Sequence, residues 1–221
     1  MNNKPSTIIT RTYQELLDLY GAQGWWPLSD CNGYHPDNYD LPQTKAQRFE
    51  ICVGAILTQN TNWKSVEIAL RNLNELQSLT PESLLALDEE TLKTAIRRAG
   101  YFNQKSGYLK TLAEFFCGRD DTIPTRQELL QLRGIGEESA DSMMLYAFHQ
   151  PWFVVDAYTR RIFSHREVVD MKERYSSIQQ KFHTALEPLY ADSERVQIYQ
   201  EYHALIVEHA KHHFSGKRKV Q

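Results

Sequence analysis

Apolar residues recur at the spacing of an α-helix along most of the chain. One run follows the positions i, i+3, i+4, i+7 and i+8, through Phe49, Cys52, Val53, Ile56 and Leu57. Residues 92–99 repeat the pattern. Residues 154–158, VVDAY, resemble a short β-run, but at this length periodicity cannot separate a strand from a buried connector. The pattern therefore predicts an all-α fold of about ten helices.

Helix start and stop signals agree with this periodicity. Thr80-Pro81 and Asp88 are typical of helix N-termini, Gly100 of the position just past a helix end, and Ser193 of the start of a final helix. Residues 21–43 are irregular, rich in Gly, Pro, Asn and Asp, and contain two tryptophans. A loop of this length inside a compact domain is usually functional or disordered.

A glycine-containing turn, LRGIGEESAD at residues 132–141, connects two predicted helices. Gly134 and Gly136 permit positive φ and close backbone approach, so N–H groups at the start of the second helix can face a phosphate. The carbonyls around Leu132 and Gly134 could hold a monovalent cation, Na⁺ or K⁺. A Gly-x-Gly turn alone is also compatible with an ordinary helical hairpin.

Overall charge does not favour a nucleic-acid partner, because the net charge is −3 and the pI is near 6.2. Residues 93–110 nevertheless carry five basic side chains and no acidic one. On composition alone, a solvated helix face is the better interpretation of this run.

The three cysteines are widely separated, which supports neither disulfides nor a cysteine-held metal cluster. The polar start and the lack of a long apolar segment predict a cytoplasmic location.

Several motifs together resemble the helix-hairpin-helix DNA glycosylases of the endonuclease III superfamily. They are LRGIGEESA, the VVDAYTR segment about 20 residues later, FEICVGAILTQNTNWKSVEIALRNL at 49–73 and AGYFNQKS at 99–106. The resemblance implies a two-lobed fold with the target nucleotide flipped into a cleft between the lobes. The central lobe would be 44–150, with the hairpin at about 125–149, and the second lobe 1–43 plus 151–221.

The resemblance also implies roles for individual residues. Asp156 matches the catalytic aspartate, which stabilises positive charge on the sugar and orients or deprotonates water. Gln59 matches the residue that fills the space left by the flipped base. The DNA backbone would be bound by Arg133, Gly134, Ile135, Gly136, Ser139 and Lys105. Without the motifs, Asp156 would be interpreted as a helix N-cap and Gln59 as a polar residue at a helix C-terminus.

This chain departs from the strand-cutting members of the family in two features. Those members carry a lysine nucleophile at the position where this chain has Glu138, and a carboxylate cannot form the Schiff base. We therefore expect a monofunctional glycosylase without AP lyase activity. No cysteine follows Cys117, so no iron–sulfur ligands are expected. His209 and His213 have helical metal-ligand spacing but no evident third ligand.

The branch of 3-methyladenine DNA glycosylases that lacks the iron–sulfur cluster is the most similar, through GWWP at 24–27 and LTQNTNW at 57–63. A cationic alkylated base is a good leaving group and is attracted to electron-rich rings. The resemblance assigns the base pocket to Trp25, Trp26, Pro27, Trp63 and Lys211. Two adjacent tryptophans cannot both face the same way, and we favour Trp26 with Pro27 over Trp25.

Two alternatives remain open. One is an endonuclease III-like glycosylase and AP lyase for oxidised or mismatched pyrimidines, in which Lys211 or another lysine replaces the missing nucleophile. The other is a non-catalytic helix-hairpin-helix DNA-binding module, against which Asp156 and the tryptophan loop argue. The expected partner is double-stranded DNA with damaged bases, bound by a monomer in the cytoplasm, in the nucleoid if the source is bacterial. No membrane partner, and no cofactor beyond the hairpin cation, is expected.

Overall fold

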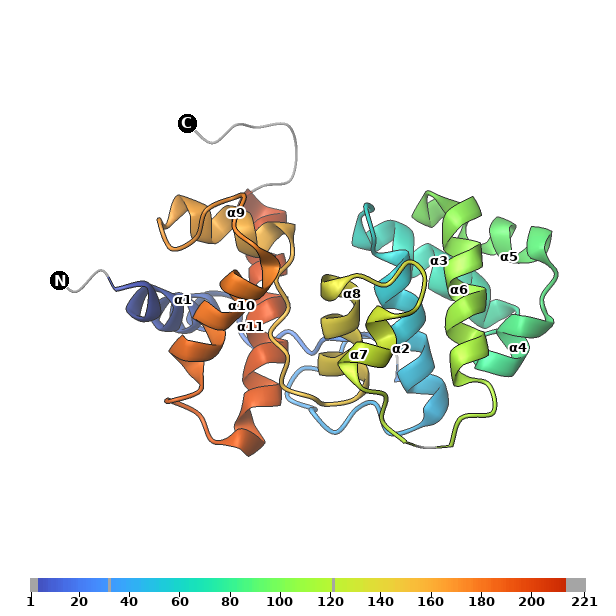
Figure 1. The fold of residues 1–221 in the computed structure, drawn as a ribbon, viewed down its shortest axis with the longest axis horizontal. Helices are drawn as coiled ribbons and strands as arrows, with labels where there is room; N and C mark the ends of the chain where they lie inside the picture. Colours follow the sequence, from blue (N-terminus) through green and yellow to red (C-terminus); the bar gives the residue numbers. More distant parts are fainter. Residues whose placement is uncertain (1–3, 32, 121, 214–221) are drawn as a thin grey trace. The chain divides into compact units, whose positions relative to one another are not determined.

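The computed structural model describes residues 4–31, 33–120 and 122–213, and these are almost entirely helical (Figure 1). The α-helices are α1 Pro5–Tyr20, α2 Lys45–Leu57, α3 Trp63–Glu75, α4 Pro81–Ala86, α5 Glu89–Ile96, α6 Phe102–Phe116, α7 Arg126–Leu130, α8 Glu137–Ser142, α9 Ala157–His165, α10 Tyr175–Leu186 and α11 Asp192–His213. Two 3₁₀ turns, η1 Ser29–Cys31 and η2 Arg97–Ala99, and the π-helical turn η3 Met143–Ala147 complete the regular structure. Within the described ranges, β-type pairing is limited to one bridge between Leu28 and Gly33, which confirms the all-α prediction.

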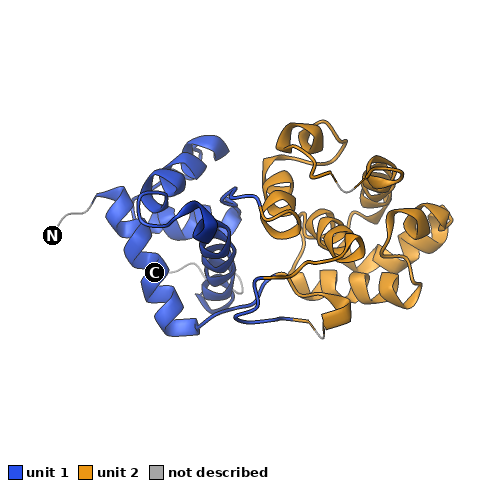
Figure 2. Cartoon of the chain, turned by 90° about the horizontal axis from the view of Figure 1, so that it is seen from below, with its two compact units in different colours: residues 1–25, 34–39, 150–221 blue, residues 26–33, 40–149 orange. Residues whose placement is uncertain are grey.

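The chain forms two compact units (Figure 2). Unit 2 comprises the described residues of 26–33 and 40–149. Helix α2 contacts α3, α6, α8 and η3 within this unit, so every side chain from Ile51 to Leu57 is buried. Because neighbours pack all round it, the apolar residues of α2 are not confined to one face.

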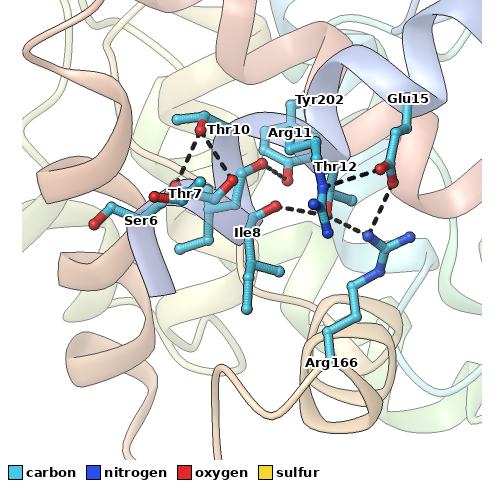
Figure 3. A network of polar contacts seen from close by, with 10 residues as sticks. Ser6, Thr7, Ile8, Thr10, Arg11, Thr12, Glu15, Arg166 and Tyr202 are labelled. Atoms are coloured by element: carbon cyan, nitrogen blue, oxygen red, sulfur yellow. Dashed lines mark hydrogen bonds and ion pairs between the residues drawn. The ribbon is translucent and has the colours of Figure 1, made fainter. Parts of the chain in front are cut away.

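Unit 1 comprises the described residues of 1–25, 34–39 and 150–221. Here α1 packs on α10 and α11, and α9 packs on α11. Figure 3 shows polar contacts that fix α1: Arg166 Nη1 donates to Thr12 Oγ1 at 2.7 Å and to Glu15 Oε2 at 3.0 Å. The buried Tyr202 hydroxyl of α11 donates to the carbonyl of Ile9 at 2.6 Å. The Arg166 contacts join the end of α9 to α1, and the Tyr202 contact joins α1 to α11, which carries His203 and Lys211.

The predicted division at residue 43 is wrong for two stretches of the tryptophan loop. The described residues of 26–33 and residues 40–43 belong to unit 2 rather than to the unit formed by the chain ends. The physical reason is side-chain packing that composition does not reveal. The Trp26 ring meets those of Trp63 and Tyr146 edge to face at 5.2 and 5.3 Å. The chain therefore passes from unit 1 to unit 2 between Trp25 and Trp26.

Most helix boundaries follow the local signals. Thr80 caps α4, Asp88 caps α5 through the Thr91 amide, and Gly100 ends η2 with φ of 71°. The last helix begins at Asp192, one residue before the predicted Ser193. None of the helices in the described ranges is both long and apolar enough to span a bilayer.

Candidate active site

Asp156 lies at the start of α9, after residues 151–155, which have no regular structure. Its Oδ1 accepts hydrogen bonds from the Thr159 amide at 2.6 Å and from the Thr159 hydroxyl at 2.7 Å. Its Oδ2 lies 3.7 Å from Nε2 of His203. One carboxylate can therefore cap the helix with one oxygen and leave the other for chemistry, so the two interpretations of Asp156 are compatible.

His203 is a site residue that the sequence did not suggest. It lies on α11, is buried, and faces Asp156. Burial by itself would raise the pKa of Asp156, but His203 and the hydrogen bonds from Thr159 outweigh it and lower that pKa below its ordinary value. No sequence signal singled out His203, because the carboxylate that it faces lies at the start of another helix. The structure thus holds Asp156 as a carboxylate in a largely dry setting.

The glycine turn forms as expected, but its two glycines differ. Helix α7 ends at Leu130, and Gly136 is the N-cap of α8. Gly134 has φ of 88°, and a Cβ there would lie 2.2 Å from Cγ of Tyr108. Gly136 has φ of −97° and ψ of −178°, with open space where a Cβ would be. Gly136 does not use the positive φ that a glycine permits, and only Gly134 is fixed as glycine by the protein itself.

The other predicted DNA-backbone residues of the hairpin differ in accessibility. Arg133 is exposed, whereas the Ile135 side chain is buried and its N–H donates to the Leu132 carbonyl at 3.1 Å. Ser139 is buried and its hydroxyl accepts a hydrogen bond from Gln59 Nε2 at 3.0 Å. The Ile135 amide and the Ser139 hydroxyl oxygen thus each have one protein partner, and the roles of Ile135 and Ser139 in binding the DNA backbone stay predictions.

Gln59, the predicted duplex wedge, follows the end of α2 and is half-buried. Its Nε2 also donates to the Gly134 carbonyl at 2.8 Å. The side chain thus connects the end of α2 to the hairpin. Both carbonyls predicted to bind a cation, those of Leu132 and Gly134, accept protein hydrogen bonds. The wedge and the cation site stay predictions.

Lys105 is not a DNA-backbone contact in this structure, which corrects the sequence-based assignment. Its side chain is 2% exposed, and its Nζ donates to the carbonyls of Leu57, Gln59 and Ala99 at 2.8, 2.7 and 2.9 Å. Burial lowers the pKa of Lys105 to about 8. The ammonium uses two donors at the C-terminal end of α2 and one at the end of η2, where helices leave carbonyls without helical partners.

Replacing Lys105 with methionine is expected to lower the free energy of unfolding by about 2–3 kcal/mol, because buried carbonyls lose their donors. Lys110 is the matched control. Its Nζ donates to three carbonyls at the end of α4, those of Leu84, Leu85 and Leu87, but it is only half-buried. Water can replace it, so Lys110→Met should cost less.

Urea titration measures the two stabilities, and the salt dependence of DNA binding separates the two roles of Lys105. A phosphate contact would contribute about 0.9 to the slope of log K against log salt. We expect that slope to be unchanged in the folded Lys105→Met variant. A slope reduced by this amount, with stability unchanged, would contradict the buried role.

The residues predicted for the base pocket separate into two groups. Trp26 and Pro27 are buried in unit 2, and Trp63, with Nε1 donating to Glu67 at 2.8 Å, is half-buried against Trp26. Trp25 is 7% exposed and belongs to unit 1 with Tyr34, whose ring lies 5.9 Å away. The structure therefore brings Trp26, Pro27 and Trp63 together.

Lys211 approaches Trp25, another of the residues predicted for the base pocket. Its Nζ lies 5.8 Å from the centre of the Trp25 ring and 2.8 Å from Glu208 Oε2. The side chain is 42% exposed, which leaves the ammonium accessible. Trp25 and Lys211 thus form a cation–π pair in unit 1. The preference for Trp26 with Pro27 over Trp25 stays a prediction.

Glu138 lies in the first turn of α8 and is exposed. A carboxylate is favourable at this end of a helix because the amides there carry partial positive charge. The acidic residue that replaces the nucleophilic lysine therefore suits the helix that holds it.

Histidines and cysteines in the described residues do not gather into a metal site. The rings of His209 and His213 are 4.2 Å apart, but Nδ1 of His209 pairs with the Tyr20 hydroxyl at 3.0 Å. Burial, together with nearby His213 and Arg166, lowers the pKa of His209 to about 4. These two histidines pack within unit 1 and keep His209 neutral at physiological pH.

Known proteins match nearly the whole chain. The chain is 40% identical over 222 residues to "Putative DNA repair glycosylase MJ1434" of Methanocaldococcus jannaschii, covering 96% of this chain and 90% of that protein. It is 33% identical over 142 residues to endonuclease III of Sulfolobus acidocaldarius, covering 62% of this chain and 64% of that protein.

Solved structures give the same grouping. The Helicobacter pylori 3-methyladenine DNA glycosylase MagIII, solved with 1,N6-ethenoadenine, superposes with a TM-score of 0.73 at 25% identity, over 98% of this chain and 100% of that one. A non-covalent endonuclease III–DNA complex gives a TM-score of 0.71 at 17% identity, over 98% and 90%, and shares the fold. Residues 53–188 match the HhH-GPD superfamily base excision DNA repair proteins, and the chain therefore belongs to this superfamily as a DNA glycosylase.

Proposed function

We propose that this protein is a monofunctional glycosylase that removes alkylated bases of the 3-methyladenine type from double-stranded DNA. The observation that carries the proposal is Asp156, a buried carboxylate with a lowered pKa beside His203. Glu138 supports the absence of lyase activity, and MagIII, described as a 3-methyladenine DNA glycosylase, supports the choice of base.

Hydrolysis of the N-glycosidic bond of such a base requires little from the protein beyond one carboxylate in the correct position. An N3-alkylated adenine is cationic and leaves as a neutral base, so it requires little acid catalysis. As the N-glycosidic bond breaks, positive charge develops on the sugar, and the Asp156 carboxylate stabilises it. Oδ2 can orient water or accept a proton from it, while Oδ1 remains bound to Thr159.

Recognition of a cationic base would use aromatic rings. Trp26 and Trp63 in unit 2, and Trp25 in unit 1, offer electron-rich surfaces, and each cation–π contact contributes about 0.5–2 kcal/mol. The hairpin would bind the DNA backbone through the amides at the start of α8 and through exposed Arg133. One protein molecule suffices for one nucleotide, so we propose a monomer, active in the cytoplasm and without a cofactor.

Product analysis tests the proposal. We expect the protein to release methylated bases from a dimethyl-sulfate-treated duplex and to leave abasic sites that break only after alkali. A thymine-glycol duplex should remain uncut. Borohydride should trap no covalent adduct, because Glu138 cannot form an imine; endonuclease III serves as the positive control.

The endonuclease III relatives make one other outcome informative. Strand cleavage of the thymine-glycol duplex without alkali, together with a trapped adduct, would favour a glycosylase and AP lyase acting on oxidised pyrimidines through another lysine. That result would overturn both the proposed substrate and the proposed monofunctional chemistry.

A further inference from the structure

The segment that carries Trp26 packs along one face of α2. Gln47, Glu50 and Gly54 are spaced i, i+3 and i+7, which places them on the same side of the helix. They contact Asp30, Ser29 and Trp26 in that order. The segment 26–30 therefore runs antiparallel to α2 along this face.

Glu50 provides the central polar contact of this face. Its Oε1 accepts hydrogen bonds from the Ser29 amide at 3.0 Å and from the Ser29 hydroxyl at 2.6 Å. The residue is 5% exposed. A buried carboxylate is unfavourable unless it is hydrogen-bonded, and the two Ser29 donors meet this requirement for Glu50. Both donors belong to the chain just after Trp26-Pro27, so Glu50 fixes the outgoing side of the tryptophan segment.

Gly54 provides the place for the Trp26 ring. A Cβ at residue 54 would lie 3.0 Å from Nε1 and 3.1 Å from Cζ2 of Trp26. Glycine in a helix interior is destabilising by about 0.5–1 kcal/mol relative to alanine. Its occurrence in the middle of α2 is explained by the indole that lies against it.

Glu201 of α11 provides a second anchor, within unit 1. Its Oε2 accepts from the Gln23 amide at 2.9 Å and its Oε1 from the Gly24 amide at 3.3 Å. The residue is 3% exposed. These two amides immediately precede Trp25, so Glu201 fixes the incoming side of the tryptophan segment.

We propose that Glu50 and Glu201 are positioning residues for base recognition, which hold Trp26-Pro27 and Trp25 through the backbone on either side. This inference rests on the proposed function, because it assigns the tryptophans to the damaged base. The two carboxylates use their oxygens differently, and this difference makes the inference testable. Glu50 binds both Ser29 donors through one oxygen, whereas Glu201 binds the Gln23 and Gly24 amides through different oxygens and is also hydrogen-bonded to Tyr39.

Conservative and apolar variants should therefore behave differently at the two positions. Glu50→Gln keeps an amide oxygen for both Ser29 donors and should retain base release, whereas Glu50→Leu removes it. Glu201→Gln replaces one acceptor by an NH₂ donor, so it should behave like Glu201→Leu. For both leucine variants and Glu201→Gln we expect kcat/KM on dimethyl-sulfate-treated duplex to fall by about tenfold to a hundredfold, as the aromatic rings lose their alignment.

Fluorescence provides a readout that a general loss of stability would not change. In a Trp152→Phe background, the affected variants should show a red-shifted tryptophan emission and faster acrylamide quenching while still folded. Asp88→Leu is the matched control, since Asp88 likewise accepts the amide and hydroxyl of one residue, Thr91, at 2.9 and 2.6 Å. It should lower the melting temperature without changing kcat/KM or the emission.

The outcomes separate this inference from the proposed function. Unchanged kcat/KM or unchanged emission in Glu50→Leu and Glu201→Leu would overturn the positioning role, and so would a Glu50→Gln variant as impaired as Glu50→Leu. A wild-type protein that released no methylated base would overturn the proposed function instead. In that case the emission of the same variants still decides whether the carboxylates hold the tryptophans.

Discussion

Replacing Asp156 with asparagine is expected to reduce base release by about 10²- to 10⁴-fold, the usual contribution of a positioned acid or base. The variant should stay folded. An asparagine oxygen can still accept the two hydrogen bonds from Thr159 that begin α9. What is lost is the negative charge that stabilises the developing cation on the sugar. Single-turnover release of methylated bases measures the effect.

The chain contains a closely matched control for this substitution. Asp88 is the N-cap of α5, and it also accepts from the amide and hydroxyl of the threonine three residues later, Thr91, at 2.9 and 2.6 Å. Asp88→Asn should leave base release unchanged. If Asp156→Asn released bases at the wild-type rate while still binding DNA, Asp156 would be only a helix cap and the non-catalytic alternative would gain support.

Because Asp156 ionises, the effect of Asp156→Asn on the free energy of unfolding should depend on pH in a direction that can be stated. Its pKa is lowered in the folded protein, so the charged form contributes stability above the unfolded pKa of about 3.9. That contribution is lost as the pH falls through the folded value. The difference in unfolding free energy between wild type and Asp156→Asn should therefore shrink below about pH 4. Urea titrations at pH 7 and at acidic pH measure it.

Helix ends and the hairpin turn could be predicted from the sequence because they depend on residues close together in the chain. Asp88, Thr80 and Gly100 could be assigned to helix ends because a cap involves atoms only three or four residues away. The hairpin between α7 and α8 could be located for the same reason. The catalytic role of Asp156 rests instead on the resemblance of its surrounding motif to that of a known family.

The positions of several site residues depend on packing between segments far apart in the chain and could not be predicted from the sequence. Lys105 stands in a basic run and looks like a phosphate ligand, but it is buried because carbonyls 46 and 48 residues earlier in the chain surround its ammonium. His203 faces Asp156 from another helix, and no local pattern links the two. Trp25 and Trp26 are adjacent in sequence, yet they pack in different units.

The two glycines of the hairpin are expected to respond differently to alanine. Gly134→Ala should lower the free energy of unfolding by about 1–3 kcal/mol, because φ of 88° strains any other residue. The added Cβ would also overlap the Tyr108 ring. Gly136→Ala should change stability by less than about 0.5 kcal/mol, since its φ is ordinary and the space around it is open. Urea titration of both variants measures these effects.

DNA binding then distinguishes a folding role from a phosphate-binding role for the same turn. If the backbone at Gly136 approaches a phosphate, its Cβ would obstruct DNA without disturbing the fold, and affinity for an abasic-site duplex should fall about tenfold, equivalent to 1.4 kcal/mol. A Gly134→Ala, Tyr108→Ala double variant should recover only the steric part of the Gly134→Ala cost, because the φ strain remains. Gly136→Ala binding DNA with wild-type affinity would show that the turn does not contact the backbone there. The second glycine would then need another explanation.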